Sequence, residues 1–202
     1  MNRVIRRLAA AALALTLAGT LAACSSQNDD LAELYRDGNN QGFISGDGRV
    51  EEIPAAERGG SVEFTGTAVD GSSVTSADYD GQVLVLNFWY AGCGPCRAEA
   101  PFLEEAFQDT REAGADFLGV NIYDGPEQAS AFEETYGITY PSILARGDVA
   151  LKQSFAAWTS LQAAPTTLVL DAEGRVAARF FGQLESASIL RTIVNDTIAE
   201  SP

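Results

Sequence analysis

From residue 61 onward, apolar and polar positions alternate in patterns typical of strands and helices in turn. The run Val83–Trp89 is almost entirely apolar, as expected for a strand buried on both faces of a parallel sheet. Ala115–Tyr123 and Ser142–Ala145 are interpreted as two further strands, and Val62–Thr65 alternates as an edge strand does. The pattern therefore predicts several strands that share one sheet.

The second half of this region adds a hairpin and the connecting helices. Thr166–Leu170 and Val176–Phe181 flank the turn Asp171–Gly174, which predicts an antiparallel hairpin. Helical spacing of apolar residues predicts helices at Gly92–Ala113, Pro126–Tyr136, Asp148–Trp158 and Glu185–Ala199. Strands separated by helices, followed by a hairpin and a last helix, predict an α/β sandwich with a central mixed sheet in one domain, residues 61–202.

The first 23 residues have the pattern of an export signal. Three arginines precede the short apolar run Leu8–Gly19, which is shorter than the ~20 residues that a membrane-spanning helix needs. The ending Leu21–Cys24 resembles the lipobox of bacterial lipoproteins, a resemblance that implies lipid attachment to Cys24 and location on the extracytoplasmic side of the cell membrane. An ordinary signal peptide with an incidental cysteine is the alternative.

Residues 24–60 are predicted to be a flexible acidic tether. They are rich in Gly, Ser, Asn and acidic residues and contain few large apolar side chains. Such a segment cannot bury enough apolar surface to offset the entropy lost on ordering. We therefore expect a signal peptide at 1–23, a tether at 24–60 and a folded domain at 61–202.

Composition excludes several classes of function. The 202 residues include 28 acidic and 13 basic side chains and no histidine, which gives a net charge of −15. This balance argues against nucleic-acid binding, which depends on clustered Lys and Arg. The absence of histidine excludes a Ser-His-Asp triad, a Cys-His pair and a histidine-ligated zinc.

The candidate chemistry lies in Cys93-Gly94-Pro95-Cys96, where the buried strand leads into a helix. A two-residue spacer at a helix start can bring both sulfurs within disulfide distance, and the helix N-terminus stabilises a thiolate. Cys93, expected to be the more exposed, is the predicted nucleophile. Cys96 is the predicted resolving thiol, and Gly94-Pro95 suits a preset turn between them.

Two other interpretations of the cysteine pair remain open. A zinc site needs four ligands, and the chain offers neither a second cysteine pair nor a histidine. A purely structural disulfide is common in exported proteins, although so short a loop contributes little chain-entropy stabilisation. We therefore expect no metal and no cofactor besides the redox-active disulfide.

The segment Asn87–Pro101 resembles the active site of the thioredoxin superfamily, most closely the membrane-anchored thiol-disulfide oxidoreductases of the TlpA/ResA type. The resemblance covers about residues 61–200 and includes Gly119–Ile122, Tyr140–Pro141 and Ala164–Asp171. It implies a thioredoxin-like three-layer sandwich.

The resemblance also implies roles for single residues. It implies that Pro165 follows a cis peptide bond, faces the cysteine pair and contacts substrate together with Ala164. Trp89, Gly94 and Pro95 are expected to complete the substrate-binding surface.

Two positions depart from the thioredoxin pattern. Asn87 stands where cytoplasmic thioredoxins have a buried aspartate, so another acid must exchange the proton. Glu99 matches a glutamate of ResA-like proteins and is expected near Cys96, where it can accept the proton; a solvated surface charge is the alternative. Gly92 replaces the tryptophan that usually precedes the first cysteine, which leaves the carried-over substrate preference open.

The resemblance implies a protein-disulfide reductase type of thiol-disulfide oxidoreductase. Expected partners are exported proteins with cysteine pairs, including apocytochrome c, a membrane thiol-electron donor, and the membrane through the lipid anchor. A peroxiredoxin-like peroxidase is one alternative, although Leu86 and Tyr90 stand where that chemistry needs Pro and Thr or Ser. A non-catalytic binding lipoprotein with a structural disulfide is the other.

Overall fold

A six-stranded mixed sheet forms the centre of the fold in the computed structural model, which describes residues 49–160 and 162–200. The strand order is β1-β8-β7-β4-β5-β6; β4, β5 and β6 are parallel, and the other neighbours are antiparallel. The strands are β1 (Val50–Glu52), β4 (Val83–Trp89), β5 (Ala115–Asn121), β6 (Ser142–Leu144), β7 (Thr166–Leu170) and β8 (Val176–Phe181). A separate hairpin consists of β2 (Thr65–Thr67) and β3 (Ser73–Thr75).

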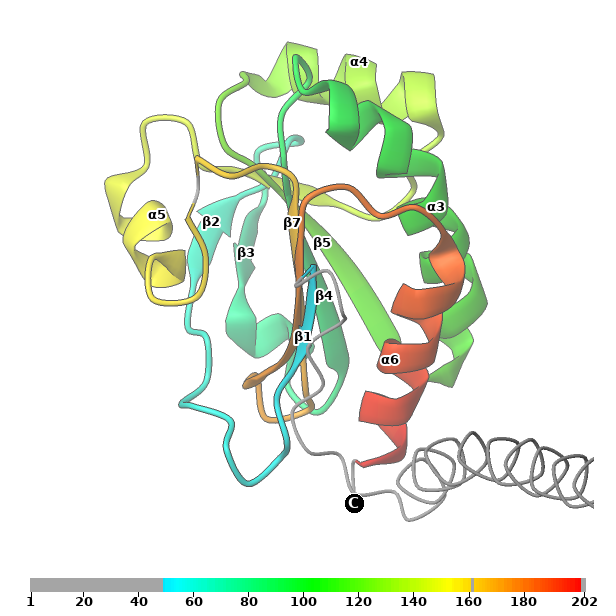
Figure 1. Cartoon of the computed structure of the whole chain (residues 1–202). Helices are drawn as coiled ribbons and strands as arrows, with labels where there is room; N and C mark the ends of the chain where they lie inside the picture. Colours follow the sequence, from blue (N-terminus) through cyan, green and yellow to red (C-terminus); the bar gives the residue numbers. More distant parts are fainter. Residues whose placement is uncertain (1–48, 161, 201–202) are drawn as a thin grey trace, which may run out of the picture. The chain divides into compact units, whose positions relative to one another are not determined.

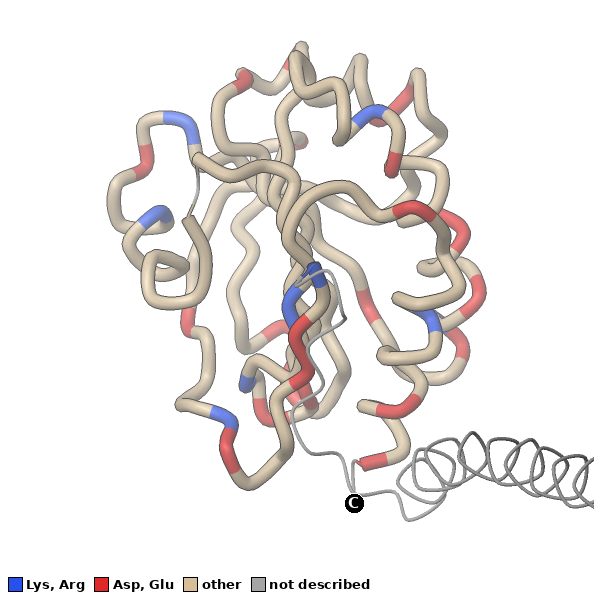
Figure 2. Tube along the Cα trace, viewed as in Figure 1, with Lys and Arg blue, Asp and Glu red and all other residues tan. Residues whose placement is uncertain are grey.

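Helices cover both faces of the sheet, so the predicted three-layer α/β sandwich is confirmed. The helices are α3 (Gly94–Thr110), α4 (Pro126–Tyr136), α5 (Val149–Phe155) and α6 (Ala187–Ala199), with short 3-10 turns at Ser76–Tyr79 and Arg111–Ala113. Figure 1 shows α3 and α6 on one side of the sheet and α5 on the other. In Figure 2, acidic positions follow α3 and α6 along the outside of the fold.

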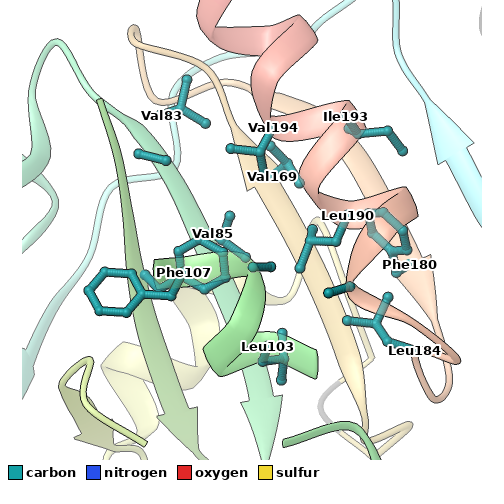
Figure 3. Close-up of a cluster of buried hydrophobic side chains, with 14 of the residues drawn as sticks. Val83, Val85, Leu103, Phe107, Val169, Phe180, Leu184, Leu190, Ile193 and Val194 are labelled. Atoms are coloured by element: carbon teal, nitrogen blue, oxygen red, sulfur yellow. The ribbon is translucent and has the colours of Figure 1, made fainter. Parts of the chain in front are cut away.

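Strand β4 separates two apolar cores because all seven of its residues are buried. Val83 and Val85 face α3 and α6, where they pack with side chains such as Leu103 and Leu190 (Figure 3). The alternate residues of β4 pack with α5 on the opposite face, in a core that includes Leu84, Leu86, Phe88, Leu151 and Phe155. Burial on both faces is the reason that this strand reads as a continuous apolar run.

The two ends of the sheet have different contents. Parallel strands β4 and β5 end at the same edge of the sheet, since Trp89 pairs with Asn121, and β7 begins at this edge, since Phe88 pairs with Thr166. We call this the disulfide end, since α3 and its cysteines follow directly from β4. The opposite end, where β7 runs into Asp171, is the Asp171 end.

The predicted boundary of the folded domain at residue 61 is wrong. Residues Val50–Glu52 form β1, which pairs antiparallel with β8, and the Arg58 side chain is only 2% exposed, in ion pairs with Asp171 and Glu200. The composition of this segment did not predict the strand, because β1 is stabilised by its pairing with β8 and by ion pairs rather than by apolar side chains. Residues 1–48, with the predicted signal peptide, Cys24 and most of the predicted tether, lie outside the described residues.

The predicted edge strand at Val62–Thr65 is also wrong, since β2 begins only at Thr65. Val62 and Phe64 alternate with exposed neighbours because they bury their side chains in the α5-side core. The Val62 N–H donates to the carbonyl oxygen of Gly174 rather than to a strand partner. The alternating pattern at Val62–Thr65 therefore predicted correctly which side chains are buried, although Val62 and Phe64 are not part of a strand.

Candidate active site

The two cysteines form a disulfide at the N-terminus of α3. The Cys93 and Cys96 sulfurs are 2.04 Å apart, and the Cα atoms are 5.2 Å apart. Cys93 is the N-cap residue, and its Sγ accepts a hydrogen bond from the backbone N–H of Cys96 at 3.1 Å. After reduction, the same N–H group and the positive end of the helix dipole favour a thiolate at Cys93.

The expected difference in exposure between the two cysteines is not found. In the disulfide form, Cys93 is 3% exposed and Cys96 is 2% exposed, so both sulfurs are buried. Gly94 and Pro95 between them are exposed and form the accessible part of the motif. The residues around the motif therefore determine whether a partner thiol can reach the two sulfurs.

Ala164, which directly precedes Pro165 just before the start of β7, lies beside the disulfide. Their peptide bond is cis, which confirms the expectation from the resemblance. Half-buried Ala164 packs against the cluster that contains both cysteines, while Pro165 is buried and its carbonyl oxygen accepts from the Gly182 N–H. The structure thus brings residues that are about 70 positions apart to one place, and their contact with substrate stays a prediction.

Trp89 forms an inner wall of the site. It is 4% exposed, belongs to the same cluster as the two cysteines, and its ring centroid lies 4.2 Å from that of Phe132 in α4. Gly119 in β5 permits this arrangement, because a Cβ there would lie 2.7 Å from the Trp89 indole nitrogen. Trp89 therefore supports the disulfide from behind.

Glu99, one helical turn after Cys96, is fully buried and is not the solvated charge of the alternative interpretation. Its carboxyl oxygens accept from Asn87 Nδ2 at 2.8 Å and from the Leu184 N–H at 2.9 Å. No Lys or Arg of the described residues forms an ion pair with it. Burial raises the pKa of Glu99 to about 7, although the two hydrogen bonds act in the opposite direction.

Asn87 explains how the site holds a carboxyl group without the usual aspartate on β4. Its amide nitrogen donates both to Glu99 and to Thr167 Oγ1, at 3.1 Å, across the β4–β7 pairing. An amide donor stabilises the carboxyl without adding a charge. A carboxyl with a pKa near neutrality can accept and return a proton at physiological pH.

Sequence reasoning missed an aromatic pair beside the disulfide. Tyr90 and Tyr123 pack edge to face with centroids 5.1 Å apart, and Tyr123 is 49% exposed. The Tyr90 carbonyl oxygen accepts from the Cys93 N–H at 3.1 Å, which places this pair directly against the motif. In the sequence, the one indication that Tyr123 lies beside the cysteines was its position at the end of a predicted strand.

Within 49–160 and 162–200, no group of three or more Cys, Asp or Glu side chains is placed to hold a metal ion. None of the helices in that part of the chain is long and apolar enough to cross a lipid bilayer.

Two relatives with similar sequences are thiol-disulfide exchange proteins. Thiol-disulfide oxidoreductase ResA from Geobacillus kaustophilus is 28% identical over 142 residues, which cover 70% of this chain and 79% of that protein. Thiol:disulfide interchange protein HelX from Rhodobacter capsulatus is 36% identical over 120 residues, which cover 59% of this chain and 64% of that protein.

Solved structures give the same result. A secreted thiol-disulfide isomerase from Corynebacterium glutamicum has a TM-score of 0.70 and 27% identity and covers 79% of this chain and 98% of its own. A DsbF homologue from Corynebacterium diphtheriae has a TM-score of 0.66 and 29% identity, with 76% and 96% covered. These similarities confirm the ResA-type resemblance and a thiol-disulfide oxidoreductase activity. Because the sequence model of the Redoxin family matches residues 51–194, the chain belongs to the Redoxin family.

Proposed function

We propose that this oxidoreductase is exported, is held at the extracytoplasmic face of the membrane by a lipid on Cys24, and exchanges electrons with cysteine pairs of exported proteins. The observation that carries the proposal is the Cys93–Cys96 disulfide at a helix N-terminus beside the cis peptide of Pro165. The pattern of residues 1–24 supports export, and one structural relative is itself a secreted protein. Apocytochrome c is the substrate to test first.

The reaction consists of two exchange steps. The Cys93 thiolate attacks one sulfur of a substrate disulfide, forms a mixed disulfide and releases the other substrate sulfur as a thiolate. The Cys96 thiolate then attacks Cys93 Sγ, which re-forms the Cys93–Cys96 bond and releases the second substrate thiolate. Two electrons have passed to the substrate, and a dithiol donor in the membrane restores them.

Glu99 is proposed to take the proton of Cys96 before the second step. It lies three residues after Cys96 on α3, is buried, and has its pKa raised by burial to about 7. A neutral partner, Asn87, holds it in place without fixing its charge. Replacement of Glu99 by Gln is expected to slow the resolution of the mixed disulfide by about 100-fold.

The substrate polypeptide is proposed to lie across the exposed Gly94-Pro95 turn and along Ala164 and Pro165. Ala164 supports this because it packs against the cysteine cluster while it remains half-exposed. Trp89 supports the disulfide from its buried side. An extended segment placed there would present its cysteine to Cys93.

Trapping of mixed disulfides tests the exchange function. The Cys96→Ser variant, expressed in the native host, should accumulate covalent complexes with exported cysteine-containing proteins, because the second step cannot occur. The Cys93→Ser variant is the matched control and should trap none. Equal complex formation by both variants, or no reduction of insulin disulfides by the reduced wild-type protein, would contradict the proposal.

Membrane attachment has a separate test. The Cys24→Ala variant should appear in the culture medium, whereas the wild-type protein should stay with the membrane fraction through the apolar area of its lipid chains. Unchanged membrane retention of the variant would refute the lipid anchor and leave the exchange function intact.

A further inference from the structure

Residue 92, directly before the disulfide, is a glycine, so the surface beside the disulfide has no side chain at this position. A Cβ built on Gly92 would lie 3.4 Å from Cε2 and 3.5 Å from Cδ2 of Tyr90, so a side chain there would rest against the Tyr90 ring. Gly92 is exposed and Tyr90 is half-buried. This face of Tyr90 is therefore open to a side chain from another molecule.

Tyr123 extends that open face. Its ring meets Tyr90 edge to face, at a centroid distance of 5.1 Å and an interplanar angle of 70°. Tyr123 is 49% exposed, one of four large exposed apolar or aromatic side chains of the described residues. Of these four, Tyr123 is the one that packs on Tyr90, whose carbonyl oxygen accepts a hydrogen bond from the Cys93 N–H.

A set of hydrogen bonds fixes Tyr123 in this position. Asn121 Oδ1 accepts from the backbone N–H groups of Tyr123, at 3.2 Å, and Asp124, at 2.8 Å. The Asp124 carboxylate in turn accepts from Asn121 Nδ2 and from the Ala91 N–H, which ties the β5–α4 loop to the turn that precedes the disulfide. The Tyr123 backbone is therefore fixed before a partner arrives, and the ring is positioned by its contact with Tyr90, which reduces the entropic cost of binding.

The charge around the two rings selects neither an acidic nor a basic partner. Arg97 is exposed, and its guanidinium donates to the Gly92 carbonyl oxygen at 3.0 Å, so a cation already occupies this rim. For a charged substrate side chain of either sign, the effect of Arg97 and the effect of the net charge of −15 oppose each other. A large apolar side chain would instead remove water from both tyrosine rings.

We propose that Tyr90 and Tyr123 form a docking surface for an aromatic or large aliphatic side chain that precedes the reacting cysteine of the substrate polypeptide. The surface takes the place of the side chain that Gly92 lacks, and Tyr123 determines specificity. This inference rests on the proposed exchange function and names the substrate class of the same site.

Three disulfide-containing peptides that differ only in the residue before the reacting cysteine test the inference. With Phe, Ser or Lys at that position, the reduced full-length protein should reduce the Phe peptide about tenfold faster than the other two, measured as kcat/KM. Tyr123→Ala should abolish this preference, and Tyr123→Phe, which keeps the ring, should retain it.

Two controls separate docking from chemistry and from folding. Ile189→Ala removes a side chain of similar exposure, 53%, on α6 and should keep the full preference. Hydroxyethyl disulfide has no flanking side chain, so the ratio of the Phe-peptide rate to the hydroxyethyl disulfide rate should fall in Tyr123→Ala and stay at the wild-type value in Ile189→Ala.

The outcomes distinguish the inference from the function on which it rests. Equal rates for the Phe and Ser peptides, a Lys peptide that reacts fastest, or a preference that persists in Tyr123→Ala would overturn the docking surface alone. Failure of the wild-type protein to reduce any of the disulfides would overturn the exchange function itself.

Discussion

The two ends of the central sheet each bury a carboxyl group, in opposite electrostatic surroundings. Asp171, 3% exposed, receives two guanidinium groups, from Arg58 at 3.0 Å and from Arg175 at 2.8 Å. Its second oxygen accepts from the backbone N–H groups of Glu173 and Arg175. The charge of this carboxylate is compensated, and it joins the segment before β2 to the β7–β8 hairpin.

Among the residues that the structure describes, Glu99 at the disulfide end has only neutral donors. Asn87 and the backbone of Leu184 satisfy its oxygens, but no cation of residues 49–160 and 162–200 compensates its charge, and burial raises its pKa to about 7. Burial of an ionised group without a counter-charge is unfavourable, and the group stays protonated to higher pH. The comparison indicates that a buried carboxylate paired with cations stabilises the fold, whereas a buried carboxyl group bonded to neutral donors can still exchange a proton.

The largest effect is expected from the loss of the nucleophile at the disulfide end. Cys93→Ser should abolish reduction of insulin disulfides, because it removes the proposed nucleophile of the first exchange step and leaves only the buried Cys96 in the motif. Its urea unfolding midpoint should stay close to that of the reduced wild-type protein, since the Asp171 end is untouched. Residual activity within tenfold of wild type would mean that Cys96 can attack directly.

A large loss of stability is expected at the Asp171 end. Arg58→Met should lower the free energy of unfolding by about 3–4 kcal/mol, because it removes a buried cation and leaves Asp171, Glu200 and the Ile53 carbonyl oxygen with fewer partners. Denaturant unfolding measures the change, and the exchange rate of the folded variant should equal that of wild type. A stability change below 1 kcal/mol would show that Arg175 alone compensates Asp171.

The pH dependence of stability should report Glu99 directly. Because its pKa is raised in the folded protein, the folded state binds the proton more tightly, and stability falls as pH rises from about 4.5 to about 7. The Glu99 contribution is the difference between the wild-type and Glu99→Gln profiles, because the raised pKa values of Glu52, Asp116 and Glu133 act in the same direction. This difference is expected to reach about 3 kcal/mol and to be complete above pH 7. Glu105→Gln, at an exposed position on the same helix, should keep the wild-type profile; the same profile in Glu99→Gln would assign the titration elsewhere.

The smallest effect is expected from an ion pair that belongs to neither end. Arg191 and Asp109 join α6 to α3 on the surface, with side chains 40% and 41% exposed. Arg191→Met should change the free energy of unfolding by less than about 1 kcal/mol, because solvent and salt screen the pair. A loss comparable to that of Arg58→Met would show that burial does not distinguish the two pairs.

Local patterns in the sequence were sufficient for most secondary structure. The strands Val83–Trp89, Thr166–Leu170 and Val176–Phe181 and the helix Pro126–Tyr136 have the predicted bounds, because each has a continuous apolar or periodic signal between clear turn residues. The short strand β1 was missed, since its stability comes from hydrogen bonds to β8 rather than from its own composition.

By itself, the sequence determined the cysteine pair, its place between a buried strand and a helix, and the resemblance that predicted the cis bond before Pro165. Only the tertiary structure decided that Glu99 is buried beside the neutral donors Asn87 and Leu184, that Tyr123 packs on Tyr90, and that Arg58 reaches Asp171. The physical reason is that backbone periodicity is local, whereas the burial and the partners of a side chain depend on residues that only the fold brings together. Leu184, which donates to Glu99, is 85 positions away from it in the chain.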